Sequence, residues 1–251
     1  MGLLKSSSSQ PIVSIKSNQV ADALIRDVLS GHYRAGERLP SERDLVARFE
    51  ANRGAVREAM AKVVQLGLAE VQPGGARVRE RELASLDTIG YLLAQNALPD
   101  PALVDQILVV INNLVSVAAT QVVESASDEA LTEVRALLQP LLRLDSSDTE
   151  HSEARFALMR HIMHTSENLP LQLIARTLFE QFAPNISAVA EFAVPDRERY
   201  AIYARQLDIA LTQRDIPSVR GTFDAFAELN RETMTRAFVI AQESSREAIA
   251  Q

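Results

Sequence analysis

Residues 34–79 constrain the fold of this chain more than any other stretch. Their apolar residues recur at helical spacing in two short segments and then alternate as in two short strands. Ser41, followed three residues later by an acid, has the spacing of a helix-starting capping box, and Asn52 can cap the second helix. Gly67 suits a left-handed helix end, and Pro73-Gly74-Gly75 suits a tight turn. The stretch therefore predicts helix, turn, helix and hairpin.

This layout is that of a winged helix-turn-helix, and arginines occupy the positions where such a unit meets DNA. Arg53 and Arg57 lie four apart at the start of the second helix, the end that reaches base edges in the major groove. The hairpin arginines, which include Arg79, suit the DNA backbone or the minor groove. The alternative is an exposed surface that carries arginines without a DNA role. The expected DNA-binding residues are Arg43, Asn52, Arg53, Arg57, Gly74 and Arg77.

The same stretch resembles the DNA-binding domain of GntR-type transcriptional regulators. Residues 39–45 read LPSERDL, residues 56–59 read VREA and residues 67–68 read GL, as in the pattern of that family. The departures from the pattern are Ala35-Gly36, Ala51-Asn52 and Gly54-Ala55. The resemblance implies binding to double-stranded DNA, whereas the departures leave the operator sequence open.

Composition places the chain among packed globular proteins that work in a reducing compartment. Its 251 residues suffice for one large or two ordinary domains, and 47% of them are hydrophobic. The chain contains no cysteine, which excludes disulfides and thiolate metal sites and fits a cytoplasmic location. No run of 18 apolar residues occurs, so no membrane span is expected. The apolar part of the N-terminus is too short for a signal peptide.

Charge divides the chain into two parts. The net charge is −7, which by itself argues against nucleic acid. Lysine and arginine outnumber acids in residues 1–80, however, and acids outnumber them in residues 81–251. This asymmetry is typical of a basic DNA reader joined to an acidic sensing domain.

After residue 80 the strand signals end and helical periodicity continues almost to the C-terminus. Helices are expected at 100–125, 127–144, 150–167, 171–190, 196–213 and 216–245, with short connections. The fold is therefore expected to be mainly α, with a winged helix-turn-helix, a small β-hairpin wing, and a C-terminal antiparallel all-α bundle of six or seven helices. The expected parts are a disordered lead 1–16, a winged helix-turn-helix 17–80 whose first helix is capped by Asn18, a linker helix 81–99 and a helical domain 100–247.

The helical region resembles the FCD domain of the FadR subfamily within the GntR family. Residues 164–170, HTSENLP, are similar to a motif of that domain, and Ala210-Leu211 followed by Asp215 is similar to a second. The resemblance implies effector binding and dimerisation by residues 100–247. It also implies a divalent metal held by one Asp and three His in most members. The positions that correspond to these four ligands are Arg155, Met159, Ala204 and Phe226.

These four side chains do not suit a divalent cation, so no metal and no cofactor are expected. An inward arginine of the subfamily is replaced by Asn112 or Asn113. His161 and His164 lie three apart on one predicted helix and could form half a metal site. A partly buried ring and a surface ring are the alternative, because no third ligand has a recognisable spacing.

Met159 and Phe226 in place of metal ligands favour an apolar ligand. In this respect the chain is similar to the metal-free member of the subfamily that binds long-chain acyl-CoA. The hypothesis is that the bundle encloses an acyl chain and that binding changes the spacing of two recognition helices. Arg155 could pair with an anionic head group, although the pattern is more typical of an exposed arginine. The alternatives are another small effector, including an organic acid bound through a metal, and a dry core without a ligand. The expected effector-binding residues are Asn112, Arg155, Met159, Ala204 and Phe226.

A dimeric transcriptional regulator accounts for both parts of the chain, because helix-turn-helix dimers read palindromic operators. An enzyme is not expected, since no nucleophile with a recognisable base and no glycine-rich phosphate loop is found. A purely architectural DNA binder leaves the acidic helical region unexplained. Repression is the working assignment, but no residue separates a repressor from an activator.

Overall fold

The computed structural model describes residues 12–250. Its contacts divide the chain into two compact units, with the division between Gln95 and Asn96. The expected disordered lead 1–16 falls in part outside the described residues, which begin at Ile12. Helices dominate both units, and the strands are confined to one hairpin in the described part of the chain.

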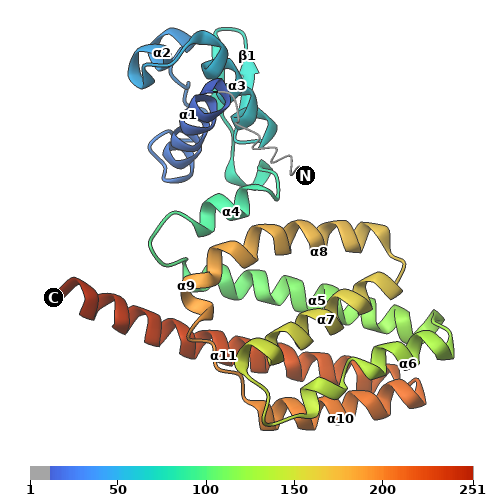
Figure 1. The fold of residues 1–251 in the computed structure, drawn as a ribbon. Coiled ribbons are helices and arrows are strands. Elements are labelled where there is room, and N and C mark those ends of the chain that lie inside the picture. Colours follow the sequence, from blue (N-terminus) through green and yellow to red (C-terminus); the bar gives the residue numbers. More distant parts are fainter. Residues whose placement is uncertain (1–11, 251) are drawn as a thin grey trace, which may run out of the picture. The chain divides into compact units, whose positions relative to one another are not determined.

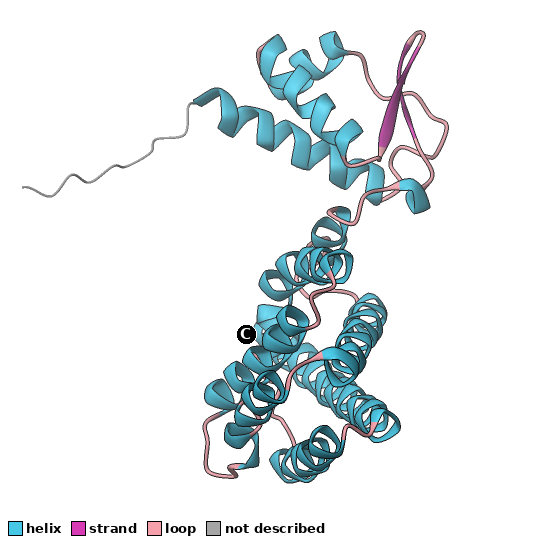
Figure 2. Ribbon diagram, turned by 90° about the vertical axis from the view of Figure 1, so that its right-hand side faces the viewer, coloured by secondary structure: helices cyan, strands magenta, loops and turns pink. Residues whose placement is uncertain are grey.

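The N-terminal unit is a three-helix cluster with a hairpin, drawn in cyan and magenta in Figure 2. The first helix begins six residues before Asn18, so residues 12–16 are helical and do not belong to a lead. No glycine or proline interrupts residues 12–29, which explains the longer helix. The elements are α1 (Ile12–Leu29), α2 (Glu42–Phe49), α3 (Arg53–Gln65), β1 (Ala69–Gln72) and β2 (Gly75–Val78).

One apolar core fixes α3 against the other two helices of this unit. The residues with no exposed surface come from α1, α2 and α3 alike, so the three helices share one interior. Truncating a fully buried leucine costs about 2–5 kcal/mol of stability, so this core holds α3 firmly. The fully buried members are Val20, Ala21, Leu24, Ile25, Leu45, Ala55, Val56 and Val63.

The sequence signals for the ends of α2 and α3 are confirmed. Ser41 Oγ accepts a hydrogen bond from the backbone of Asp44, and the Asp44 carboxylate accepts one from the backbone of Ser41. Ser41 Oγ also donates to the Asp44 carboxylate at 2.6 Å, and this hydrogen bond, followed by the one from the Ser41 backbone, lowers the pKa of Asp44. The Asn52 Oδ1 atom accepts a hydrogen bond of 2.8 Å from Ala55 N at the start of α3. Gly67 has a φ of 72°, and a Cβ there would lie 2.6 Å from the carbonyl oxygen of Leu83.

Replacing Ser41 by alanine is expected to lower the free energy of unfolding by about 1 kcal/mol, because the hydroxyl that caps the backbone N–H of Asp44 is lost, whereas the backbone N–H of residue 41 can still donate to Asp44. Urea unfolding followed by circular dichroism measures the change. Ser30→Ala, which removes an exposed hydroxyl at the end of α1, serves as the control. An equal loss in both variants would contradict a specific capping role.

The wing is wider than the predicted hairpin, because the segment before α2 runs along β2. The pairing of β1 with β2 is antiparallel and joins Ala69 to Val78 and Gln72 to Gly75. On the other side of β2, Gly36 N donates to Val78 O at 2.8 Å and Leu39 N donates to Ala76 O at 2.9 Å. The segment 36–39 is thus fixed to the wing by backbone hydrogen bonds.

Residues 81–99 do not form the single linker helix that the periodicity predicts. A 3-10 turn, η1 (Arg81–Leu83), and a short helix, α4 (Thr88–Leu93), occupy this stretch. Both belong to the N-terminal unit. Tyr91 explains this position of α4, because its hydroxyl donates to Asp22 of α1 at 3.3 Å and its ring packs under Lys62 of α3.

The C-terminal unit is an all-α bundle. The helices expected at 127–144 and 171–190 are each shorter than predicted, because Pro140 and Pro184 end the regular helix and open 3-10 turns. The elements are α5 (Pro101–Ser125), α6 (Asp128–Ala136), η2 (Gln139–Leu142), α7 (Asp148–Thr165), α8 (Leu169–Phe182), η3 (Ala183–Ile186), α9 (Ser187–Ala190), α10 (Arg197–Gln213) and α11 (Ile216–Ala250).

Helix α5 is the central element of this unit, packed against α11, α7 and α8. By length and composition alone α5 is apolar enough to cross a membrane, although no run of 18 apolar residues exists. Its buried residues Val104, Ile107, Ile111 and Val115 recur at intervals of three and four, which is the pattern of a core helix. Figure 1 shows α5 within the bundle, with α10 and α11 side by side below it.

The junction between α7 and α8 stores backbone strain at Glu167, whose φ is 50°. A left-handed conformation costs a residue with a Cβ about 1–2 kcal/mol, and glycine avoids this cost. Part of the stability gained in this way is lost again, because glycine has more conformational freedom in the unfolded chain. Glu167→Gly is therefore expected to raise the free energy of unfolding by up to about 1 kcal/mol, as measured by urea unfolding. Glu167→Ala keeps the Cβ and is the control; equal stability of the two variants would contradict the strain.

Candidate functional sites

The start of α3 presents two guanidinium groups on one exposed face. Arg53 is the first residue of α3 after the Asn52 cap, and Arg57 follows one turn later with 69% of its side chain exposed. Arg57 Nε lies 3.0 Å from the Oε2 atom of Glu42 on α2, whereas Arg53 has no ion pair in the described part of the chain. An exposed ion pair is worth at most about 1 kcal/mol, so DNA can displace Glu42 from Arg57.

The other predicted DNA-binding residues differ in how free their side chains are. Arg43 has 91% of its side chain exposed. Asn52 uses its Oδ1 atom for the helix cap, so only its amide NH2 group remains available. Gly74 has a φ of 95° at the exposed wing turn, where a Cβ would meet no other atom. Arg79 is half-buried and lies 4.0 Å from Glu70, so it is directed along the wing.

Arg77 lies on the outer face of the wing beside an arginine that the sequence analysis did not single out. Its Nη1 atom donates to Gly36 O at 2.9 Å. Arg38 pairs with Arg77 across an antiparallel bridge, and both side chains are exposed. The sequence shows Arg38 only as a loop residue, because the bridge depends on chain segments about 40 residues apart.

The helical unit contains a cavity of about 220 Å³, far more than one water molecule needs. Its wall includes four of the five predicted effector-binding residues, namely Asn112, Arg155, Met159 and Phe226. Ala204 does not line it, since it is fully buried on α10 and Tyr200, one turn earlier, reaches the cavity instead. Further lining residues, which the sequence did not indicate as part of a site, include Ser152, Phe156, Phe179, Phe182, Asn230, Thr233 and Met234.

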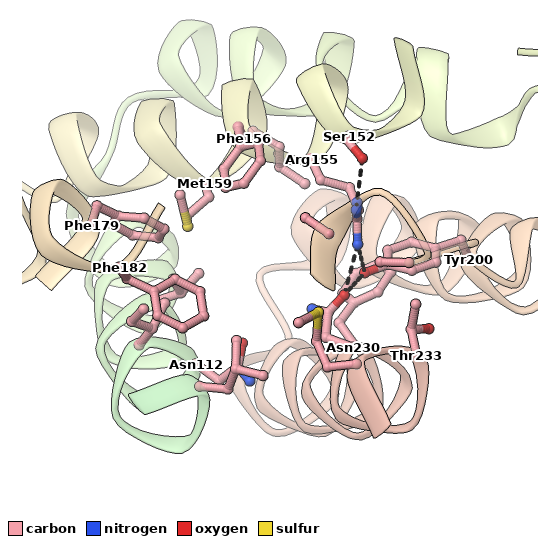
Figure 3. A pocket seen from close by; sticks show the side chains of 18 of the residues that line it. Asn112, Ser152, Arg155, Phe156, Met159, Phe179, Phe182, Tyr200, Asn230 and Thr233 are labelled. Atoms are coloured by element: carbon pink, nitrogen blue, oxygen red, sulfur yellow. Dashed lines mark hydrogen bonds between the residues drawn. The ribbon is translucent and has the colours of Figure 1, made fainter. Parts of the chain in front are cut away.

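Arg155 is not the exposed arginine that the sequence pattern favours. It is partly buried, and Figure 3 shows its side chain reaching from α7 towards Tyr200 and Asn230. Its Nη1 atom donates to Tyr200 Oη at 3.2 Å and to Asn230 Oδ1 at 2.9 Å, and Nη2 donates to Ser152 Oγ at 3.0 Å. All three acceptors are uncharged. Within the described residues no carboxylate pairs with this cation.

The positive charge of Arg155 thus lies in the cavity wall without a counter-charge. Desolvating a cation without a counter-charge is costly, and the Arg155 Nε atom is also buried without a hydrogen-bond acceptor. Asn112, on the opposite helix α5, likewise has a buried Nδ2 atom without an acceptor. Asn113, the alternative at this point in the sequence, is exposed and donates to Val109 O. Donors on two sides of the cavity thus lack acceptors.

The remaining wall is apolar. In Figure 3 the side chains of Phe156, Met159, Phe179 and Phe182 lie together on the side away from Tyr200 and Asn230. On the polar side, the Tyr200 ring stacks on Phe226 at 5.1 Å between centroids. The cavity therefore offers a cationic, hydrogen-bonding end and an aromatic end to the same ligand.

A second cleft of about 220 Å³ lies beside the cavity between α5 and α11. The two spaces share Leu108 and Met234 in their walls. At the second cleft the charged side chains neutralise each other, because Arg231 binds both oxygens of Asp105 at 2.6 and 3.0 Å. This cleft can extend an apolar binding site but has no free charge to bind an anion.

His151, next to the cavity on α7, is uncharged at neutral pH. It is fully buried, edge-on to Tyr200 at 4.8 Å, and neither ring nitrogen has a hydrogen-bond partner. Burial, together with Arg155 and Arg197, lowers the pKa of His151 to about 4. The positive charge at the cavity is therefore that of Arg155.

The arrangement does not fit a divalent cation. Arg155, Met159 and Phe226, three of the four positions where the resemblance to the FCD domain implies metal ligands, line the cavity, and a cation next to Arg155 would be repelled. Among residues 12–250, no three His, Cys, Asp or Glu side chains come together. His161 is partly buried near Glu133 and His164 is exposed, as expected for two separate rings.

Comparison with known proteins agrees with the architecture of the N-terminal unit. The family "Bacterial regulatory proteins, gntR family" matches residues 16–78, from α1 to the end of β2. The HTH-type transcriptional regulator Mce2R of Mycobacterium tuberculosis is 29% identical over 232 residues, which cover 90% of this chain and 94% of Mce2R. The HTH-type transcriptional repressor NanR of Escherichia coli O1:K1 is 32% identical over 153 residues, 58% of this chain and 55% of NanR.

Solved structures support the fold. A protein described under "Lar controls the expression of the Listeria monocytogenes agr system and mediates virulence" aligns with a TM-score of 0.52 and 17% identity, over 94% of this chain and 99% of its own. The curated relatives are regulators and not enzymes. The winged helix-turn-helix and the family match identify residues 16–78 as a DNA-binding domain of the gntR type, and the relatives that align with the chain are helix-turn-helix transcriptional regulators.

Proposed function

We propose that this regulator is of the FadR type and binds a palindromic operator as a homodimer. In this proposal α3 reads base edges through Arg53 and Arg57, and the wing contacts the DNA backbone. Two-fold symmetry of the protein then matches two half-sites about one helical turn apart. Residues 100–247 form an FCD-like domain that binds the effector and dimerises, and the protein acts in the cytoplasm.

We further propose that the effector is an anion with an apolar body, for which a fatty acid or long-chain acyl-CoA is the first candidate class. The observation that carries this proposal is Arg155, a cation without an acidic partner in a cavity that is otherwise apolar. A carboxylate or phosphate would receive charge-assisted hydrogen bonds from Arg155 and Asn112. The apolar part would lie against Phe156, Phe179 and Phe182, with room beyond Leu108 and Met234 for a longer chain.

Two other sensing modes remain as alternatives. A short organic acid could use the Arg155 end of the cavity without the aromatic end. A metal-dependent response has less support, because the corresponding ligand positions carry Arg155, Met159 and Phe226. A regulator without any small ligand leaves the uncompensated charge of Arg155 without a role.

The test is native mass spectrometry of gently purified protein, followed by thermal unfolding with a series of fatty acids, acyl-CoAs and short organic acids, with and without chelator. A co-purified acyl species, or stabilisation that grows with chain length and ignores chelator, is the expected result. Stabilisation by short organic acids alone, and only when metal is present, would support the metal-dependent alternative and contradict the proposal.

The variant Arg155→Met is expected to weaken binding of the best carboxylate by about 1.5–3 kcal/mol, the usual worth of hydrogen bonds to a charged group. Isothermal titration calorimetry measures the loss. Arg160→Met is the control, because this exposed arginine of α7 has no ion pair in the described chain. Unchanged affinity in Arg155→Met would exclude Arg155 as the anion ligand.

Repression is the proposed direction of control, because NanR, the relative with 32% identity, is named a repressor. A reporter gene placed behind an operator selected by the protein would test this. Two increases in reporter expression are expected, one when the regulator is deleted and one when effector is added to cells that contain the wild-type regulator. A fall on deletion would identify an activator.

A further inference from the structure

Arg38 and Arg77 form a like-charged pair on the outer face of the wing. They are directly opposed in an antiparallel bridge, so their side chains leave the same face. Like charges in this position destabilise a strand pair. Arg77 hydrogen-bonds only to the uncharged Gly36 carbonyl, and Arg38 has no ion pair within the described residues. The pair therefore lacks a counter-charge.

Two acids that could pair with these arginines have other partners. Glu70 is the residue opposite Arg77 on β1, but its carboxylate lies near Arg79 and accepts a hydrogen bond from the side chain of Gln72. The charge of Arg38 contributes only a little to the lowered pKa of Asp44, whose main cause is hydrogen bonding from Ser41. Both carboxylates thus have their own partners.

Because Gly75 has no side chain, the guanidinium group of Arg38 can lie close to the wing turn. A Cβ on Gly75 would stand 2.7 Å from Arg38 Nε and 3.1 Å from Nη2. These distances are too short for any side chain, so a larger residue at 75 would push the guanidinium away. Gly75 also has a φ of 131°, a conformation that L-residues rarely adopt.

We propose that Arg38 and Arg77 together bind the phosphate backbone of the operator, and that Gly75 is a positioning residue for Arg38. A phosphate between the two guanidinium groups supplies the missing counter-charge and relieves their repulsion. The contact is independent of base sequence, because the DNA backbone is uniform. This inference rests on the proposed role of the wing in operator binding and adds a residue from the segment before α2.

The experiment measures the affinity of Arg38→Ala by fluorescence anisotropy over a range of salt concentrations. The probes are a duplex that the wild-type protein selects from a random pool and a scrambled duplex of the same composition. The salt slope is the slope of the logarithm of the binding constant against the logarithm of the salt concentration. Loss of one phosphate contact is expected to reduce the magnitude of this slope by about one. The affinity for both duplexes is expected to fall roughly fivefold at 0.15 M salt. Arg205→Ala, which removes the same charge from an exposed position of α10, is the control.

Three further variants separate a DNA contact from a structural role. Arg38→Lys keeps the positive charge, so the salt dependence of DNA binding is expected to stay close to that of the wild type. Gly75→Ala is expected to lower the slope as Arg38→Ala does, and the double variant is expected to show no further loss. Because Arg38→Ala removes a repulsion, its melting temperature is expected to equal or exceed that of the wild type.

Three results can contradict these expectations, and they are distinguishable. A wild-type salt slope in Arg38→Ala, with normal DNA binding, would overturn the role of Arg38 alone. Absence of both a salt slope and a preferred duplex in the wild-type protein would overturn the proposed operator binding itself. A lower melting temperature in Arg38→Ala together with an unchanged slope would assign Arg38 a purely structural role.

Discussion

Simultaneous replacement of Arg53 and Arg57 by alanine is expected to weaken binding to the preferred duplex by about 2–6 kcal/mol. Each arginine at the start of a recognition helix contributes about 1–3 kcal/mol through bidentate contact with guanine. The structure supports this role because both guanidinium groups are exposed on one face of α3, whose core side is fixed by buried apolar residues. Fluorescence anisotropy with the selected duplex measures the loss.

The scrambled duplex is the decisive comparison for this pair. Contacts to bases give a large loss on the selected duplex and a smaller loss on the scrambled one, since only the electrostatic part is shared. Equal losses on both duplexes would show that Arg53 and Arg57 contact phosphates alone. The single variants divide the effect between the two residues.

Glu42 provides a matched control for Arg57. Its carboxylate holds the Arg57 guanidinium at 3.0 Å in the free protein, and DNA binding must break or adapt this pair. Glu42→Gln removes the acid without removing the arginine. Affinity is therefore expected to stay equal or rise slightly, and a loss similar to that of Arg57→Ala would mean that Glu42 orients Arg57 for DNA.

The sequence predicted the DNA-binding unit well because its signals are local. Ser41 with Asp44, Asn52 and Gly67 each act within a few residues, so their spacing alone predicts the helix ends. The third segment of the wing was missed for the opposite reason. Its pairing joins Arg38 to Arg77, and no local pattern reports a contact between positions so far apart.

The helical unit was predicted less completely, and the errors have identifiable causes. Pro140 and Pro184 break two helices whose apolar periodicity continues across the breaks. The stretch 81–99 was expected as a linker helix, but Tyr91 packs α4 against the N-terminal unit. Such tertiary contacts override a periodic pattern, and they are invisible in the sequence.

The cavity shows the same division. Arg155, Met159 and Phe226 were assigned through the resemblance, as positions of metal ligands, and Asn112 was assigned as the replacement of an inward arginine. Spacing did not show that Arg155 is partly buried, because its partners Tyr200 and Asn230 come from α10 and α11. Ala204 was assigned by counting along a motif, and a difference of one helical turn moved the true lining position to Tyr200.

Below neutral pH the helical unit is expected to lose stability because of His151. This ring is fully buried, and its pKa is lowered to about 4 by burial and by the positive charges of Arg155 and Arg197, against the opposing charge of Asp148. In the unfolded chain a histidine has a pKa of about 6.5. Between these two values the unfolded state binds the proton and the folded state does not, so stability rises with pH in this window.

The expected loss follows from the two pKa values. The stability contributed by neutral His151 is fully present at pH values well above about 6.5. The free energy of unfolding is expected to fall by about 2 kcal/mol between pH 7 and pH 5, and by about 3 kcal/mol in total between pH 7 and pH 4. Urea unfolding at a series of pH values, in the window above the titration of the carboxylates, measures the dependence. His151→Phe replaces the ring by one that cannot be protonated, and its stability is expected to vary much less with pH.

Two comparisons make the assignment to His151 specific. His164→Phe changes an exposed histidine of the same helix, and the wild-type pH dependence is expected to persist in it. If the larger ring of His151→Phe prevents folding, His151→Leu tests the same point with an uncharged aliphatic side chain. A variant without His151 that still loses about 2 kcal/mol between pH 7 and pH 5 would show that another buried group takes up the proton.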